Sequence, residues 1–517
     1  MCTALELARN GVRSLVLERR RRGERWLART NLTNIRSMEH FRRWGVADRL
    51  RANDPVSEDI PRSITWVTAL NGYVVTDFER AVDFPEPLPF ASERPEWAPN
   101  AGIEKTLHEA VAEHPLIDVG FGCEVVGFDQ DGGEVVVAYT SGGGERHVSA
   151  QYLVAADGSR SGIRRQLGVR MQGQADLVHA CIVLIHAPDL MRGATVGRAS
   201  FYFFINEYRD SAMLIQQDNV GHYMFGLIPA SEGFDPEDWE ATRTLLFRNV
   251  GYEFPVTKVS GGLVRIHSLM APRFDHGRIL LAGDAAHLIS PMGGFGMNIG
   301  VGDAADVGWK LAAVIKGWGG TRLLESYSQE RAAVERWIQE ECIDNTNRSA
   351  PQLVEEGISE PGPAGEAVRS RVAKRIIEAK TKEFASIGAQ LGYRYDDSPV
   401  IVDDGSPRPP LSMAHYEPCA RPGARAPHVW LRDGVSLFDR FGAGFTLLKL
   451  GDVDTGRFES AAAAVGMPLK LLRLDHPGVS ELYEKKLVLV RPDQHVAWRG
   501  DAVPENVARI IDIVRGA

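Results

Sequence analysis

The chain has 517 residues, and 59 Lys and Arg against 68 Asp and Glu give it a formal net charge of −9 at pH 7. At roughly 100–200 residues per domain this length predicts two to four domains, and the composition, 44% hydrophobic and 25% charged, is typical of a folded globular protein and not of a disordered one. The negative charge argues against a nucleic-acid partner bound through a basic face.

Cysteine spacing and hydropathy exclude several further classes of protein. The five cysteines stand singly, at positions 2, 123, 181, 342 and 419, with no CxxC pair and no histidines at zinc spacing. A disulfide framework and a metal site are therefore not expected. No apolar run reaches the roughly 18 residues of a membrane span, and the first residues lack the pattern of a signal peptide. We expect a cytoplasmic protein without a membrane span.

The first residues predict the second half of a dinucleotide-binding βαβ unit. Thr3–Asn10 has apolar residues at helical spacing and ends at Gly11, and Ser14–Glu18 is a short aliphatic strand closed by an acid. The strand and GxGxxG turn that normally precede such a helix are missing. Because loss of a central parallel strand would open the core, we expect a start assigned too far downstream or an N-terminal truncation.

The next 140 or so residues continue this α/β pattern. Asn31–Leu50 predicts a turn and an amphipathic helix, and Gly102–Val111 predicts another helix. Alternating apolar residues and glycine-rich turns between 118 and 148 predict a hairpin or meander. The apolar strand Tyr152–Ala156 then stops at Asp157-Gly158.

A β-rich stretch follows between about 178 and 264, and its candidate strands are Ala180–Ile185, Ala199–Ile205, Met213–Gln216 and Tyr223–Ile228. The α/β pattern resumes at Arg278–Ala282, with long helical patterns over 302–316 and 323–347. A β-rich insertion between two α/β blocks predicts a substrate domain laid over a cofactor domain.

The C-terminal hundred residues predict a separate unit. Pro, Gly and Asp cluster at 361–364 and 403–410, which indicates a linker. The expected elements are strand 446–449, helix 457–465, strands 470–474, 486–490 and 496–499, and helix 504–514, an order typical of a thioredoxin-like domain. Because there is no CxxC, we assign this domain to packing or dimer contacts and not to dithiol exchange.

The segment Arg278–Lys310 carries the strongest functional signal. A buried strand stops at Gly283-Asp284, the glycines at 293, 294 and 296 form a tight turn, and a helix follows. Glycine lets the backbone approach a flat ligand closely, the helix N-terminus favours negative charge, and Asp284 can accept hydrogen bonds from sugar-like hydroxyls. The structural alternative is a glycine-rich loop with an Asp helix cap.

This segment, with His287, Pro291 and Asn298, resembles the second FAD motif of the FAD-dependent aromatic hydroxylases, the single-component flavoprotein monooxygenases of the phenol and hydroxyphenylpropionate hydroxylase type. Asp157-Gly158-Ser159, with Ser161 and Arg164, is similar to that family's DG motif, which is associated with FAD and NAD(P)H. The resemblance implies an α/β fold: a glutathione-reductase-like FAD-binding domain, lacking its first strand and glycine-rich turn, with a β-rich substrate domain and a C-terminal thioredoxin-like domain. The expected boundaries are 1–177 for the first part of the FAD-binding domain, with a substrate-domain excursion near 62–98, 178–270 for the substrate domain, 271–347 for the second FAD-binding part, 348–410 for a helical segment and linker, and 411–517 for the thioredoxin-like domain.

The resemblance also implies roles for individual residues. Asp284, with Gly283, would bind the ribityl chain, Pro291 would lie near the flavin carbon that carries the peroxide, and the backbone of Gly294, Gly296, Met297 and Asn298 would meet the pyrimidine edge. Glu18 would hold the adenosine ribose. The implied FAD contacts also include Asp157, Arg36 and Asn100. Arg36 lies with Asn34 in a segment that is near the flavin in relatives, and Asn100 stands where relatives often carry Gln.

The implied activity is an NADPH- or NADH-consuming monooxygenation, in which a flavin C4a-hydroperoxide formed from dioxygen hydroxylates a phenolic or polyketide ring. The base that would help the phenol lose its proton is not marked by a motif. The candidates are His179, Tyr202, Tyr208, His222 and Tyr223, of which we nominate Tyr202 and Tyr223, although a lone His or Tyr on a strand is more often a core or rim residue. The partners expected are a small aromatic substrate, dioxygen and a second copy in a homodimer. Another reaction on the same fold and a truncated, non-catalytic remnant acting as a binding partner are the alternatives.

Overall fold

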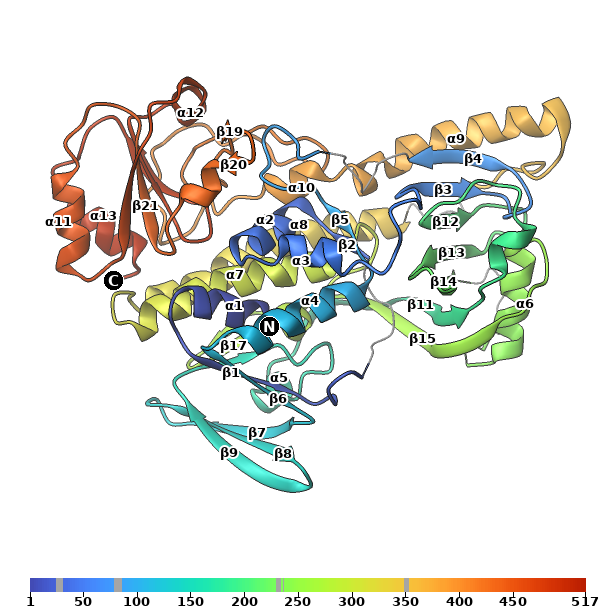
Figure 1. Cartoon of the computed structure of the whole chain (residues 1–517), viewed down its shortest axis with the longest axis horizontal. Helices are drawn as coiled ribbons and strands as arrows, with labels where there is room; N and C mark the ends of the chain where they lie inside the picture. The colour runs from blue at the N-terminus through green and yellow to red at the C-terminus, as the bar shows by residue number, and fades with distance from the viewer. Residues whose placement is uncertain (25–30, 79–85, 229–233, 236, 348–352) are drawn as a thin grey trace.

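A computed structural model of the chain describes residues 1–24, 31–78, 86–228, 234–235, 237–347 and 353–517. Long helices cross the middle of the molecule, a large sheet lies at one end and the C-terminal unit at the other (Figure 1). Among the described helices, none combines the length and apolar character that a bilayer-spanning helix needs.

The central α/β region is built from two small parallel pairings. After α1 (Cys2–Arg9), β1 (Ser14–Glu18) pairs with β6 (Ile117–Phe121), while β10 (Leu153–Ala155) pairs with β17 (Ile279–Leu281), whose other edge meets β16 (Asp275–His276). In the part of the chain that the structure describes, β1 and β10 belong to separate sheets. The helices of this region are α2 (Ile35–Arg43), α3 (Ala47–Ala52), α4 (Asn100–Glu113), α5 (Gly162–Gln166), α7 (Gly296–Ile315) and α8 (Arg322–Asn347).

The expected meander forms a three-stranded antiparallel sheet below this region, with β7 (Glu124–Gln130), β8 (Val135–Ser141) and β9 (Gly144–Ala150) (Figure 1). Its inner face packs on the core through Val135 and Val137, which lie in one cluster with Ile279 and Leu280 of the strands beside it.

The β-rich segment forms an eight-stranded sheet of order β18–β15–β11–β14–β13–β12–β3–β4. Its strands are β3 (Ile64–Val67), β4 (Val74–Phe78), β11 (Gln172–His186), β12 (Phe201–Phe204), β13 (Ser211–Gln216), β14 (His222–Ile228), β15 (Thr257–Met270) and β18 (His287–Leu288). The two strands from residues 64–78 thus join the sheet far from their neighbours in sequence, and β3 runs parallel to β12. All other pairings in this sheet are antiparallel.

The two faces of this sheet have different neighbours, because side chains alternate along a strand. One face packs under α6 (Trp239–Val250), where Leu246 and Val250 meet Tyr202 and Phe225. The opposite face carries Phe201, Ile215 and Met224 in one apolar cluster with Trp97 and Leu32, which come from β5 (Glu96–Trp97) and β2 (Leu32–Thr33) near the α/β region. The second face is therefore the one turned toward the central α/β region.

Two helices join the sheet to the rest of the molecule. The long α9 (Gly362–Phe384) lies along β4 (Figure 1) and packs Val372 and Ile376 on Trp66. The short α10 (Ile387–Leu391) follows and packs against α2.

The C-terminal unit is a four-stranded sheet of order β22–β21–β23–β24 flanked by helices. Its elements are β19 (Trp430–Arg432), β20 (Val435–Ser436), β21 (Phe445–Lys449), α11 (Gly456–Ala464), β22 (Leu469–Arg473), α12 (Pro477–Tyr483), β23 (Leu487–Val490), β24 (Val496–Gly500) and α13 (Val507–Val514). The six elements expected from sequence are present within a few residues, and β19, β20 and α12 are additional. Phe445 and Trp498 share a core with Trp309 of α7, so this unit is docked on the central helices.

Candidate active site

The turn after β17 is shaped to receive a ligand. It is a short 3-10 helix, Gly283–Ala285, in which Gly283 has φ +58 and Asp284 is exposed. A Cβ at Gly283 would meet nothing within 4 Å, whereas a Cβ at Gly300 would lie 3.4 Å from the Gly283 Cα. The turn is therefore pressed against α7 on one side and open on the other.

A buried cluster behind the turn holds it in place. Asp303 of α7 accepts hydrogen bonds from the Gly283 N–H at 3.0 Å, from His287 Nε2 at 2.7 Å and from Arg331 Nε at 2.8 Å. Burial opposes ionisation of Asp303, but His287 and Arg331 outweigh it and keep the pKa of Asp303 below its usual value. Glu335 Oε1 lies 3.3 Å from His287 Nε2, and burial and the nearby Asp303 charge raise the pKa of Glu335 well above its usual value.

A second turn leads into the N-terminus of α7. The Gly294 N–H donates to the Pro291 carbonyl at 3.0 Å, and Gly293 and Gly294 have φ +115 and +70. Pro291 is exposed. Because α7 begins at Gly296, the main-chain N–H groups of its first turn have no acceptor within the helix and can bind an anion or a carbonyl edge.

Asn298 clamps this second turn to the start of α2. Its Nδ2 donates to the carbonyls of Gly294 at 2.7 Å and Leu32 at 2.9 Å, and its Oδ1 accepts from the Asn34 N–H at 2.9 Å. Asn34 in turn caps α2, since its Oδ1 accepts from the Ser37 N–H. The backbone at 294–298, which we expect to contact the flavin, is thus held in place by the Asn298 side chain.

The turn after β10 lies beside the first turn. Asp157 is exposed and its Oδ2 accepts from the Ile163 N–H at 3.2 Å, while Ser161 caps α5. Arg164 joins the two turns, because its Nη1 donates to the Ala285 carbonyl and its Nη2 to the Ser159 carbonyl, both at 2.9 Å. Burial lowers the pKa of Arg164.

A third group lies at the carboxyl end of β1. Arg20 donates to both Glu18 Oε2 and Glu104 Oε2 at 3.2 Å, and the Arg20 N–H donates to Glu18 Oε1 at 3.0 Å. Asn100 is hydrogen-bonded to Glu104, whose pKa is nevertheless raised by burial. Arg20 therefore links Glu18 to Glu104, the side chain that Asn100 contacts.

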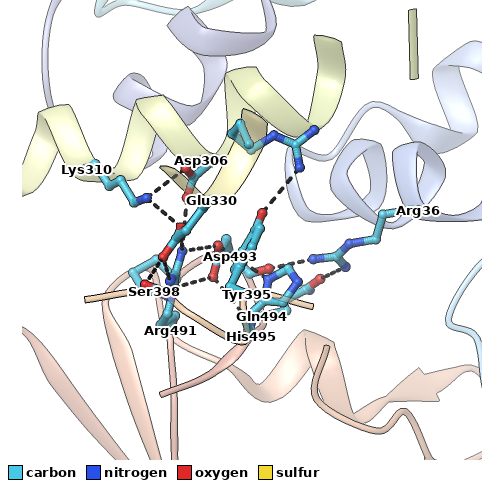
Figure 2. A network of polar contacts seen from close by, with 12 residues as sticks. Arg36, Asp306, Lys310, Glu330, Tyr395, Ser398, Arg491, Asp493, Gln494 and His495 are labelled. Atoms are coloured by element: carbon cyan, nitrogen blue, oxygen red, sulfur yellow. Dashed lines mark hydrogen bonds and ion pairs between the residues drawn. The ribbon is translucent and has the colours of Figure 1, made fainter. Parts of the chain in front are cut away.

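Arg36 is not part of these groups. Its guanidinium donates to Gln494 Oε1 at 2.6 Å and to the Asp493 carbonyl at 2.5 Å in the C-terminal unit (Figure 2), and to Glu39 Oε2 at 3.0 Å within α2. The Arg36 side chain is thus held by the C-terminal unit and by Glu39, and the flavin contact that the resemblance implied for it stays a prediction.

The two tyrosines nominated as bases also lie elsewhere. Tyr202 and Tyr223 are buried on the α6 face of the sheet. The Tyr202 hydroxyl donates to the Gly197 carbonyl and accepts from the Ala199 N–H, both at 2.7 Å, and burial raises the pKa of each tyrosine. Both side chains therefore pack in the core under α6, on the face opposite the one that carries Phe201.

Sequence reasoning placed Asn34 near the flavin but missed Asp303, which supports the first turn. Asp303 stands in a pattern that otherwise indicates only a helix. A buried acid inside the long apolar helix α7 is the one signal that marks Asp303, because an unpaired charge there would be costly.

The arrangement fits FAD. The exposed Asp284 offers acceptors for polyol hydroxyls beside a turn with open space over Gly283, and the N-terminus of α7 offers main-chain donors to the pyrimidine edge. Glu18, which ends β1, offers a carboxylate to a ribose.

Comparison with known proteins agrees with this geometry. Residues 1–341 match the family model described as FAD binding domain, and residues 419–516 match that described as aromatic-ring hydroxylase, C-terminal. The chain is 32% identical to the FAD-dependent monooxygenase apdD of Emericella nidulans, over 99% of this chain and 88% of that protein. It is also 32% identical to the aklavinone 12-hydroxylase RdmE of Streptomyces purpurascens, over 99% and 95%.

Two solved structures show the same fold over the whole chain. The rebeccamycin biosynthetic enzyme RebC with reduced flavin superposes with a TM-score of 0.90 at 34% identity, covering 100% of this chain and 96% of that one. A ternary complex of aklavinone-11 hydroxylase with FAD and aklavinone gives a TM-score of 0.82 at 28% identity, covering 100% and 97%.

Proposed function

Because the chain belongs to the FAD-dependent aromatic-ring hydroxylases, we propose that it inserts one atom of dioxygen into a ring of a polycyclic, polyketide-derived phenol, with NADPH or NADH as reductant. The observation that carries the proposal is the pair of joined turns at Asp157 and Asp284, set against the N-terminus of α7. The relatives named for aklavinone support the polycyclic substrate.

FAD, when bound, supplies the transfer of electrons from the nicotinamide and the activation of dioxygen. The protein binds and orients it: Asp284 accepts from the ribityl hydroxyls, Glu18 accepts from the adenosine ribose, and the first N–H groups of α7 donate to the pyrimidine edge. Asn298 and Asp303 hold these groups in place through the contacts described above. Pro291 is exposed at the second turn, and we place the reacting ring of the substrate beside it.

The apolar face of the large sheet binds the aromatic rings. Phe201, Ile215 and Met224 with Trp97 provide contact area and keep water from the reacting atoms. Orientation of the ring beside the flavin is then the main contribution of the protein to the rate.

The alternative of a non-catalytic remnant is not favoured. The chain covers 96% of the RebC chain, and the elements that hold the turns are present. A homodimer remains part of the proposal. The exposed apolar side chains Val259, Leu263 and Val264 of β15 support it, and light scattering tests it through an expected mass of two chains.

The deciding experiment is NADPH or NADH oxidation by FAD-loaded protein with a panel of simple and polycyclic phenols. We expect faster oxidation with polycyclic phenols and a product that gains one oxygen atom, which ¹⁸O₂ labels. Oxidation that yields only hydrogen peroxide with every phenol would contradict the proposed substrate class, and failure to bind FAD would contradict the proposed function.

A further inference from the structure

The turn between β23 and β24, residues 491–495, lies against α2 of the FAD-binding region (Figure 2). Its Gln494 and Asp493 accept two of the hydrogen bonds that Arg36 donates, and Glu39 of α2 accepts another. Arg36 is 4% exposed and Gln494 is 2% exposed, so this contact is closed to water.

The backbone at Gln494 is unusual. Its φ is +68, in the left-handed region that side chains other than glycine rarely adopt. Such a conformation costs free energy and persists where the surroundings impose it. Here the side chain is held by Arg36, and the Asp493 carbonyl faces the same guanidinium.

The turn is also fixed to the middle of α7. Arg491 donates to Asp306 at 3.0 Å, to Glu330 at 2.6 Å and to Asp493 at 2.7 Å, and Lys310 donates to the same Asp306 and Glu330 (Figure 2). Because these groups are buried and hydrogen-bonded, the turn is a rigid support for Arg36.

The contact of this turn with Arg36 is close to the candidate site. Arg36 lies two residues after Asn34, whose N–H is bound by Asn298 Oδ1, and Asn298 Nδ2 holds the Gly294 carbonyl. Only Arg36 and the start of α2 separate Gln494 from the clamp on the glycine turn.

We propose that the β23–β24 turn is a positioning element of the flavin site, and that Gln494, acting through Arg36, sets the start of α2 against Asn298 and thereby the glycine turn at the pyrimidine edge. Gln494 itself is a positioning residue, since it touches neither cofactor nor substrate in this arrangement. The identity of the cofactor rests on the proposed function.

The test uses the full-length protein with Gln494→Met, which keeps the side-chain length and removes the acceptor oxygen, and Gln494→Gly, which also relieves the left-handed backbone. The control is Glu484→Gly in the same unit. Glu484 also has a positive φ, +61, but its exposed side chain contacts Arg499 and no described residue of α2.

Two measurements decide the matter: amide hydrogen exchange of residues 34–38 without FAD, and the dissociation constant of FAD. Both Gln494 variants are expected to speed exchange at residues 34–38 and to weaken FAD binding, each by about fivefold, the lower end of typical coupling between sites. Gln494→Gly is expected to lose less melting temperature than Gln494→Met, because it relieves the left-handed backbone, and Glu484→Gly is expected to change neither measurement.

Unchanged exchange and unchanged FAD affinity in Gln494→Met, whatever its melting temperature, would overturn the positioning role. If the wild-type protein binds no FAD, the proposed function fails, and the exchange measurement alone still decides whether Gln494 orders the start of α2.

Discussion

The guanidinium of Arg164 and the main-chain oxygen of Ala285 are joined by a hydrogen bond of 2.9 Å, although the two residues are 121 positions apart in the sequence. This bond makes the turn after β10 and the turn after β17 one ligand-binding surface. We expect Arg164→Met to weaken FAD binding and to lower the free energy of unfolding by about 1–3 kcal/mol, because the Ala285 and Ser159 carbonyls lose a charged donor. FAD titration and urea unfolding measure the two effects, and Arg165→Met, altering a neighbouring exposed side chain, is the control.

Asp284→Ala is expected to lower FAD affinity at least tenfold, about 1.4 kcal/mol, by removal of a charged acceptor. Since Asp284 is exposed, the melting temperature of the FAD-free protein should stay unchanged. The visible flavin spectrum after gel filtration gives the occupancy. Wild-type flavin content in this variant would rule out the ribityl contact.

Asp303→Asn should damage both stability and cofactor binding. It leaves Arg331 buried without its carboxylate, which costs about 3–5 kcal/mol, and it weakens the hold on Gly283. Asp210→Asn removes another buried carboxylate, paired with Arg248 in the sheet domain, and should lower stability without changing FAD affinity. Equal loss of FAD affinity in both variants would show that Asp303 acts only through general stability.

Tyr202→Phe is expected to lower the free energy of unfolding by about 1–3 kcal/mol, because the Ala199 N–H and the Gly197 carbonyl lose their partner. The rate of hydroxylation should be unchanged. Phe201→Ala, one residue away but on the opposite face, should raise KM for the phenol instead. A large loss of kcat in Tyr202→Phe would instead indicate that the Tyr202 hydroxyl takes part in the reaction.

Stability should fall as the pH drops from about 6.5 to 4. Burial, and then the Arg425 charge, lowers the pKa of His428 to about 4 despite the nearby Glu39, so the folded protein keeps this imidazole neutral. The unfolded chain binds a proton at a pKa of about 6.5 and is favoured below it, by at most about 1.4 kcal/mol per pH unit. Urea unfolding between pH 7 and 4.5 measures the slope of the free energy of unfolding against pH. In His428→Gln this slope should correspond to about one proton fewer taken up on unfolding.

Local pattern was enough to predict most elements of the site. Glycines that need positive φ, such as Gly283 and Gly294, and apolar runs that stop at them mark turns without reference to the rest of the fold. The direction of Arg36 was not predictable, because its partner Gln494 lies 458 positions away. Alternation along β12 shows that Tyr202 and Phe201 face opposite sides, but the side that faces the cofactor is decided by where α6 packs.

Several expectations from sequence stay predictions. These are the proposed domain boundaries and the thioredoxin-like character of the C-terminal unit.

The charges around Arg491 have a consequence for how the protein is made. Lys310 can neutralise only one of the two buried carboxylates Asp306 and Glu330, and the second counter-charge, Arg491, is synthesised 161 residues after Glu330, so the nucleotide-binding half carries one uncompensated buried charge until the end of synthesis. The match to two separate family models therefore does not divide the chain into two independent folding units, and a fragment ending before β23 should aggregate where the intact polypeptide stays monodisperse.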